Sequence, residues 1–269
     1  CIVTTADQEY LPYLTVFYNS FFEKIKNIEL FIVAVNIEDK LNFSKMFNKA
    51  KIFYIDKQLN DVDDLPQPNI DGRRLSQKVA YCNNVRFLMF EKFFSIGYDV
   101  LYLDVDSIFN KDISDIFDFF IDHDLILIPK SLDHLTLEPK STENRLWCGG
   151  FLGFKNCDIT KRILTNIKIE LTVFNKLYKW GNQIILRDCI DKFINDVKIK
   201  MLDPRIYHDC CKFCETSCVW SEKVARKGYA QYKINKNEQE IKNILGYEKS
   251  EKYINRMVEY GIDKKYTEL

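Results

Sequence analysis

The first hundred residues alternate between short apolar runs and amphipathic segments. The apolar runs, which have the length of buried strands, begin at residues 1, 30, 51 and 98. The segments between them repeat apolar side chains at helical spacing, over about 12–26, 38–49 and 76–96. Three strand–helix units in succession form a parallel sheet with helices on both faces. The sequence therefore predicts an α/β fold with a mainly parallel central sheet.

The remainder of the chain continues the mixture of strands and helices. Further strands are predicted at 124–130, 147–155 and 197–202. Helices are predicted at 114–121, 158–174, 182–194 and within 238–260. The segments predicted as irregular are 58–75, 131–145 and a cysteine-rich loop at 203–220. No internal repeat or low-complexity linker divides the chain, so we expect one domain over 1–269.

Charge and cysteine content narrow the partners and the location. Lys plus Arg and Asp plus Glu both number 39, so no global field favours nucleic acid. No apolar run is long enough to span a membrane. Nine cysteines scattered through apolar segments indicate reduced thiols. We expect a cytoplasmic location, as a free chain, as a domain of a longer protein or at a membrane surface, and the oligomeric state stays open.

Two acids end the apolar run that begins at residue 98. Asp104 and Asp106 are two residues apart, so on a continuous strand they point to the same side. The carboxyl ends of strands are where open α/β sheets bind ligands. Two carboxylates there can hold a Mg²⁺-like ion that takes its other ligands from substrate phosphates. The alternative is a strand that ends in solvated acids.

The first strand is not followed by a glycine-rich phosphate loop. The sequence from Thr4 to Gln8 is TTADQ, which is neither G-x-G-x-x-G nor a P-loop. This argues against a dehydrogenase, a P-loop NTPase and a sugar nucleotidyltransferase. A diphosphate would then need a metal ion and basic side chains. Arg86 and Lys78 lie two helical turns apart and could supply them, unless both belong to a solvated helix face.

These motifs together carry a resemblance to a known family. Residues 2–13 and 19–21, then Arg86, then the strand ending in D-x-D, resemble GT-A fold glycosyltransferases and are similar to glycosyltransferase family 8. The resemblance implies a Rossmann-like GT-A fold, a UDP-sugar donor and Mn²⁺ or Mg²⁺. We therefore expect a nucleotide-binding half at 1–130, and an acceptor half with C-terminal helices at 131–269.

The resemblance assigns roles to residues of the first half. It implies that Thr4, Asp7 and Tyr10 hold the nucleobase; a turn residue and a helix-packing tyrosine are the alternatives for the last two. Arg86 would contact the first acid and the diphosphate or donor sugar, with Lys78 beside it. The two acids of the D-x-D motif, Asp104 and Asp106, would hold the metal. The donor would contact Asp104 and Val105 of the same motif.

Two later segments resemble the donor-sugar contacts of the family. Gly149 and Gly150 resemble the end of an Asn-Ala-Gly segment, with Cys148 in place of Asn; a β-bulge is the alternative. Gln183 resembles the last residue of a Gly-Asp-Gln pattern and would lie near the anomeric carbon. Asn182 replaces the Asp of that pattern, and its alternative role is to cap the helix. Gln183 and Arg86 are thus the candidate catalytic residues.

The family also adds a late histidine as third metal ligand, followed by basic contacts to the diphosphate. Ser221 stands where that histidine would be, and His208 is an alternative ligand. Lys223, with Arg226 and Lys227, could neutralise the departing diphosphate or form a solvated basic cluster.

Four cysteines near His208 form a second constellation. Their positions are 210, 211, 214 and 218. The C-x-x-C spacing suits Zn²⁺, but the second pair of a zinc knuckle is missing. Zinc, a disulfide and free thiols all stay open.

The sequence thus predicts a metal-dependent glycosyltransferase that moves a sugar from a UDP-sugar to a glycan, lipid-linked or protein acceptor. Inversion would need a base, for which Asp133, Glu138 and Asp209 are candidates, whereas the resemblance favours retention. The alternatives are a non-catalytic adaptor that docks through the cysteine-rich loop, and a sugar nucleotidyltransferase. Donor sugar and acceptor are not determined.

Overall fold

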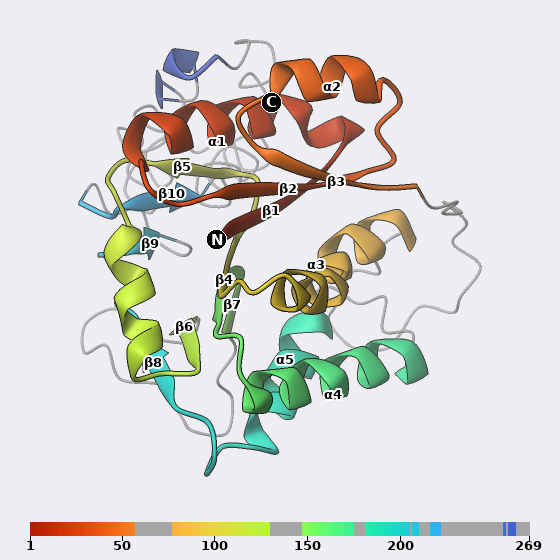
Figure 1. Ribbon diagram of the computed structural model, residues 1–269, viewed down its shortest axis with the longest axis vertical. Coiled ribbons are helices and arrows are strands. Elements are labelled where there is room, and N and C mark those ends of the chain that lie inside the picture. Colours follow the sequence, from red (N-terminus) through yellow and green to blue (C-terminus); the bar gives the residue numbers. More distant parts are fainter. Residues whose placement is uncertain are drawn as a thin grey trace, which may run out of the picture. The chain divides into compact units, whose positions relative to one another are not determined.

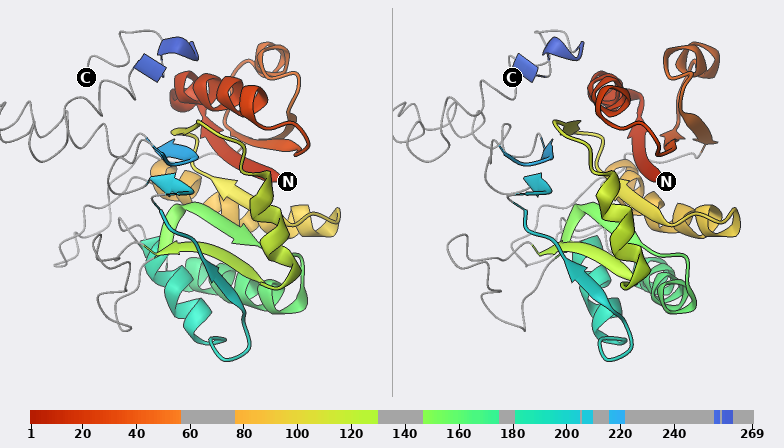
Figure 2. Two further views of the ribbon diagram at one scale, coloured as in Figure 1. Left: turned by 90° about the vertical axis from the view of Figure 1, so that its left-hand side faces the viewer. Right: turned by 60° about the vertical axis from the view of Figure 1, so that its left-hand side comes forward.

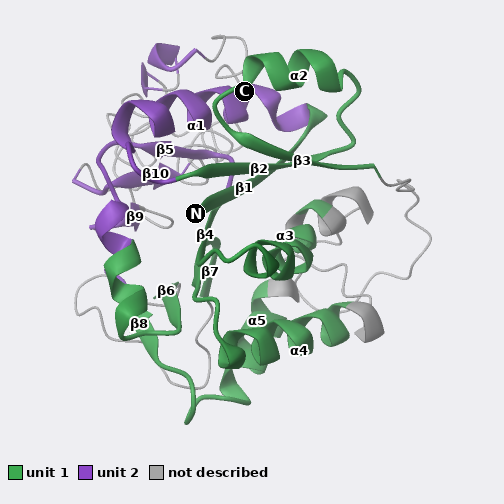
Figure 3. Cartoon of the chain, viewed as in Figure 1, with its two compact units in different colours: residues 1–8, 29–103, 117–201 green, residues 9–28, 104–116, 202–269 purple. Residues whose placement is uncertain are grey.

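The computed structural model describes residues 1–56, 77–129, 147–174, 181–204, 206–209, 216–221, 255–256 and 258–261. The chain divides into two compact units, each assembled from separate stretches of sequence (Figure 3). Unit 1 comprises residues 1–8, 29–103 and 117–201, and unit 2 comprises residues 9–28, 104–116 and 202–269. These boundaries differ from the division expected near residue 130, which stays a prediction.

Unit 1 contains a seven-stranded sheet in the order β3-β2-β1-β4-β7-β6-β8 (Figures 1 and 2). Its strands are β1 (Ile2–Asp7), β2 (Leu30–Val35), β3 (Lys51–Ile55), β4 (Val100–Leu103), β6 (Leu125–Pro129), β7 (Trp147–Phe154) and β8 (Ile199–Met201). All neighbouring strands are parallel except at β7, which runs antiparallel to both β4 and β6. The predicted α/β fold with a mainly parallel sheet is confirmed.

Helices of unit 1 cover both faces of this sheet (Figure 1). They are α2 (Lys40–Met46), α3 (Gln77–Ser95), α4 (Asp158–Phe174) and α5 (Gly181–Asp191). Phe53 of β3 joins the core that α3, α4 and α5 build on one face. The next residue, Tyr54, points the other way, packs on Phe43 of α2 and donates a hydrogen bond of 2.9 Å to the Lys40 carbonyl. The alternation of strand side chains thus separates the two helical layers.

Strand β7 fits between its two neighbours only because it carries a glycine. Gly153 pairs with Leu101 of β4 and Ile126 of β6. A Cβ on Gly153 would lie 2.7 Å from the Ile126 Cβ and 3.3 Å from the Phe120 ring. Glycine in a strand interior often marks this kind of close approach.

Unit 2 is built on helix α1 (Leu11–Lys24) and a three-stranded sheet, β5-β10-β9. These strands are β5 (Ser107–Phe109), β10 (Val219–Ser221) and β9 (His208–Asp209). Phe109 joins sheet to helix, because its ring packs edge-on against Phe17 at 5.1 Å and Phe21 at 5.5 Å. Its backbone N–H also donates to the Ser20 hydroxyl at 3.2 Å. The prediction of a loop at 203–220 is therefore wrong for β9 and for the start of β10.

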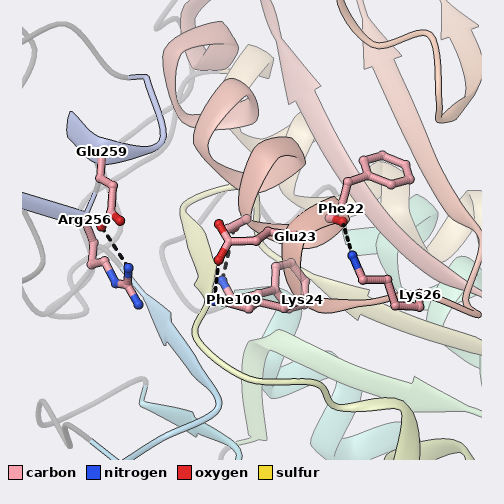
Figure 4. Close-up of polar contacts among 8 residues, drawn as sticks. Phe22, Glu23, Lys24, Lys26, Phe109, Arg256 and Glu259 are labelled. Atoms are coloured by element: carbon pink, nitrogen blue, oxygen red, sulfur yellow. Dashed lines mark hydrogen bonds and ion pairs between the residues drawn. The ribbon is translucent and has the colours of Figure 1, made fainter.

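Figure 4 shows polar contacts between side chains and backbone groups of unit 2. Beyond the end of α1, Lys26 donates to the Phe22 carbonyl at 3.2 Å. In the C-terminal segment, Arg256 pairs with Glu259 at 2.8 Å. The predicted irregular segments at 58–75 and 131–145, and most of the predicted helix within 238–260, lie outside the described residues. No helix among the described residues is long and apolar enough to cross a membrane.

The close approach at β7 gives a stability prediction. Gly153→Ala places a methyl group inside normal contact distance of Ile126, so strands β6 and β7 must move apart. We expect the free energy of unfolding to fall by about 1–3 kcal/mol, measured by urea denaturation. Ile169→Ala, at a side chain that is 54% exposed on α4, serves as control. Equal stability of the two variants would contradict the packing described here.

Candidate active site

Polar side chains from several elements of unit 1 lie at one end of its sheet, where the parallel strands β1 and β4 terminate. Asp7 and Leu103 are the last residues of the parallel strands β1 and β4. Leu103 pairs with Phe151, so the first four residues of antiparallel β7 extend beyond the end of β4. Carboxyl ends of parallel strands are the usual ligand edge of such sheets. The extension of β7 brings its glycines to that edge.

Three residues singled out from the sequence meet at this edge; we call them the arginine–glycine–glutamine group. Arg86 of α3 is 3% exposed, and its Nη1 donates to the Gly149 carbonyl at 2.6 Å. A Cβ on Gly149 would lie 3.0 Å from Nε2 of Gln183, on α5, and 3.3 Å from Nη2 of Arg86. The groups that lie against Gly149 are therefore the side chains of the two candidate catalytic residues.

The environment of Arg86 differs from the one expected for a simple phosphate ligand. Its guanidinium lies 4.8 Å from the centre of the Tyr102 ring, which is a favourable cation–π distance. Because its Nη1 donates to the Gly149 carbonyl, the Arg86 side chain holds the start of β7 in place. The register of β6 with β7 shifts here, between Leu127 and Pro129, and the bulge considered from the sequence stays a prediction. Contact of Arg86 with a diphosphate stays a prediction.

The end of β1 holds a second polar contact. Asp7 is 6% exposed, and the thiol of Cys82, on α3, donates to its Oδ2 at 3.8 Å. Strand alternation puts Thr5 on the Asp7 face and Thr4 on the opposite face. Both threonine hydroxyls are buried without a hydrogen-bond partner among the described residues. Thr4, expected to contact the base, thus lies on the face away from Asp7, and its role stays a prediction.

Cys82 and Thr5 were not recognised as site residues from the sequence. Cys82 lies one helical turn before Arg86, and Thr5 lies two residues before Asp7. The helical period places Cys82 on the same face of α3 as Arg86, and the strand period places Thr5 on the same face of β1 as Asp7. These two periods could therefore have predicted both residues from the sequence.

In unit 2, the D-x-D motif forms a turn. Strand β4 ends at Leu103, and the Ser107 N–H donates to the Asp104 carbonyl at 3.1 Å. The expectation that both acids continue a strand is therefore wrong, and strand alternation does not govern their side chains. Asp106 is 8% exposed and accepts a hydrogen bond of 3.4 Å from the Ser221 hydroxyl. Asp104 is half-buried, and Val105 is buried.

Strand pairing explains why Ser221 reaches the motif. Ser221 of β10 pairs with Ser107, the residue that follows Asp106. His208, the other candidate ligand, is 1% exposed and pairs with Val219 in the same small sheet. Ser221, which stands where the family's late histidine is expected, is thus the residue that contacts the second acid.

The donor set fits a metal ion that takes part of its coordination from substrate. Among the described residues, no group of three or more His, Cys, Asp or Glu side chains could hold a metal. Asp104, Asp106 and the Ser221 hydroxyl offer oxygen atoms, which suit Mg²⁺ or Mn²⁺ rather than Zn²⁺. A Mg²⁺-like ion commonly uses one or two carboxylates together with substrate phosphates. The residues present therefore fit the expected ion.

The other expected residues are only partly described. Gly150 is buried in β7, and Tyr10 in unit 2 is 36% exposed, with its ring 5.8 Å from that of Tyr13. Eight side chains lie outside the description, namely those of Lys78, Asp133, Glu138, Asn182, Asp209, Lys223, Arg226 and Lys227. Three cysteines of the second constellation, 210, 211 and 214, also lie outside it. Burial raises the pKa of the Cys218 thiol, which disfavours the thiolate that a zinc site needs.

Comparison with known proteins identifies the family and the fold. A family model for nucleotide-diphospho-sugar transferases matches residues 45–237. No curated protein sequence matches the chain. The galactosyltransferase LgtC, solved with donor and acceptor sugar analogs, is similar with a TM-score of 0.59 and 13% identity, over 100% of this chain and 99% of LgtC.

Two further solved structures belong to proteins longer than the part that this chain matches, and the match spans about half of each. The glycosyltransferase GlyE of Streptococcus pneumoniae matches 87% of this chain with a TM-score of 0.51 and 16% identity, but the match spans 49% of GlyE. The bifunctional glycosyltransferase WbbM matches 82% of this chain with a TM-score of 0.51 and 12% identity, over 45% of WbbM. Because the family model covers more than half of the chain, this protein belongs to the nucleotide-diphospho-sugar transferase family and is a glycosyltransferase with the GT-A fold.

Proposed function

We propose that this enzyme transfers a sugar from a UDP-sugar to a hydroxyl of a glycan, lipid-linked or protein acceptor, and that it needs Mn²⁺ or Mg²⁺. The family supports the nucleotide-sugar donor. The metal dependence is carried by one observation, which is the buried Asp106 held by Ser221 two residues after Asp104. The six cysteines among the described residues are free thiols, which supports a reducing location such as the cytoplasm.

In this proposal the two acids of unit 2 hold the ion. The Ser221 hydroxyl donates to Oδ1 of Asp106 and orients that carboxylate, as hydrogen bonds to ligating carboxylates do in metal sites. Asp104 is half-buried, and so part of its surface is open to solvent. The bound ion would neutralise charge on the departing diphosphate.

The arginine–glycine–glutamine group of unit 1 would contact the donor sugar. Arg86 holds the Gly149 carbonyl, and the missing side chain at Gly149 leaves room for the Gln183 amide. A second LgtC structure is that of an active-site variant in which a glutamine is replaced by glutamate, so a glutamine belongs to the active site of that protein. Gln183 is our candidate for the same part of this enzyme.

A donor-hydrolysis screen tests the proposal as a whole. The protein is incubated with a panel of nucleotide sugars and Mn²⁺, and free nucleotide is measured. We expect release of UDP, loss of release with EDTA and recovery when Mn²⁺ is restored. Release from another nucleotide sugar alone would overturn the choice of UDP, and release that persists in EDTA would overturn the metal dependence.

Asp106→Asn tests the metal ligand. The amide keeps the size of the side chain but removes the charge that binds the cation. We expect Mn²⁺-dependent UDP release to fall by about 100-fold or more. Asp118→Asn, at an exposed acid of the 3₁₀ segment η2 (Ser114–Ile121), is the matched control and should keep full release. Similar activity of the two variants would remove Asp106 from the metal site.

Gly149→Ala tests the proposed sugar contact separately. The new methyl group would press on the Gln183 amide at 3.0 Å and displace it. We expect turnover to fall by about tenfold or more, because small misplacements of reacting groups are costly. Affinity for UDP with Mn²⁺, measured by calorimetry, should stay near that of the wild type. Ile184→Ala, at the 36% exposed neighbour on α5, is the control. Loss of UDP affinity without loss of turnover would contradict this assignment.

A further inference from the structure

Cys82 makes a contact that the proposed chemistry has not used. Its thiol donates to Oδ2 of Asp7 at 3.8 Å, which joins α3 to the carboxyl end of β1. Asp7 is 6% exposed and Cys82 is half-buried, so the contact is sheltered from solvent. The two residues are 75 positions apart in the sequence. The thiol therefore restricts the carboxylate from a separate element.

A second buried polar group lies on the same face of β1. The Thr5 side chain lies on the same face of β1 as Asp7 and is 7% exposed. Its hydroxyl has no hydrogen-bond partner among the described residues. Leaving a buried hydroxyl without a partner costs free energy, and buried polar groups are seldom left so. A polar ligand that contacts this face of β1 would supply the missing hydrogen bond.

We propose that Cys82 is a positioning residue for donor binding. Its thiol holds Oδ2 of Asp7 and so orients a carboxylate that would accept from an N–H of the donor's nucleobase, and the Thr5 hydroxyl would make a second contact. This role rests on the proposed function. The thiol must be protonated to donate, so alkylation of Cys82 removes the hydrogen bond and adds bulk beside Asp7.

The chain contains a matched reference for this contact. Cys157 is also half-buried, and its thiol donates to Oδ1 of Asp124 at 3.5 Å. Asp124 directly precedes β6, which runs in the same direction as β4. This pair therefore lies at the amino end of the strands, whereas Asp7 lies at the carboxyl end. Both pairs join a thiol to a carboxylate, although the Cys157 thiol also lies 3.5 Å from the Thr160 hydroxyl, and they differ in their place on the sheet.

Alkylation kinetics test the contact without any ligand. Iodoacetamide labelling of Cys82 and Cys157 is followed by peptide mass spectrometry in the wild type and in Asp7→Asn. A nearby carboxylate disfavours the thiolate that reacts, so its removal should speed labelling of Cys82 by about tenfold. Labelling of Cys157 should not change. Equal labelling of Cys82 in both proteins would overturn the contact.

UDP binding tests the positioning role. Calorimetry with UDP and Mn²⁺ should show affinity weakened by about fivefold in Cys82→Ala, which is the usual effect of losing one hydrogen bond. Cys82→Ser keeps a donor and should restore affinity, and Cys157→Ala should match the wild type. UDP should also slow labelling of Cys82 but not of Cys157. Thermal unfolding of each variant shows that it is folded.

The possible failures are distinguishable. If the wild type binds UDP and Cys82→Ala binds it equally well, the role of Cys82 is wrong and the proposed donor stands. If the wild type binds no UDP in the presence of Mn²⁺, the UDP-sugar donor is overturned, and the role of Cys82 with it.

Discussion

The hydrogen bond from Arg86 to the Gly149 carbonyl holds together the part of unit 1 in which the candidate residues lie. Burying a guanidinium is costly, and here a carbonyl at 2.6 Å from Nη1 and the face of Tyr102 replace part of the water that it loses. The bond ties α3 to the extension of β7 beyond the end of β4. Gly149 also lies against the Gln183 amide, so the contact joins two of the three candidate residues beside the third.

Unit 2 positions its acids in another way. A turn at Asp104–Asp106 leads into β5, and the pairing of β5 with β10 brings Ser221 to Asp106. Phe109 secures this strand against α1 through two edge-on ring contacts. The carboxylate is thus oriented by a short sheet whose own anchor is aromatic packing. A serine hydroxyl can orient an acid, but it is a weaker metal ligand than the histidine expected from the resemblance, so substrate oxygens would supply more of the coordination.

Fold, family and chemistry rest on different observations in this protein. The similar solved structures are 12–16% identical to the chain, and they establish the GT-A fold. The family model establishes the class of nucleotide-diphospho-sugar transferases. The donor base, the metal and the reacting residues are proposals instead, which the resemblance and the side-chain contacts support. One of those contacts is the thiol–carboxylate pair of Cys82 and Asp7 at the end of β1. Because thiol labelling can probe this pair, it can be tested without knowing which sugar the donor carries.

The sequence by itself determined the order and type of the long elements. Strand alternation and helical spacing are local patterns, so β1 to β4 and helices α1 to α5 lie close to their predicted positions. The sequence also indicated Arg86, Gly149 and Gln183. Only the tertiary structure showed that these three meet, that Asp104 and Asp106 form a turn, and that Cys82 contacts Asp7 and Ser221 contacts Asp106 across 75 and 115 positions. Strands of two or three residues show no period of their own, and contacts between distant residues form only when the elements that carry them pack together.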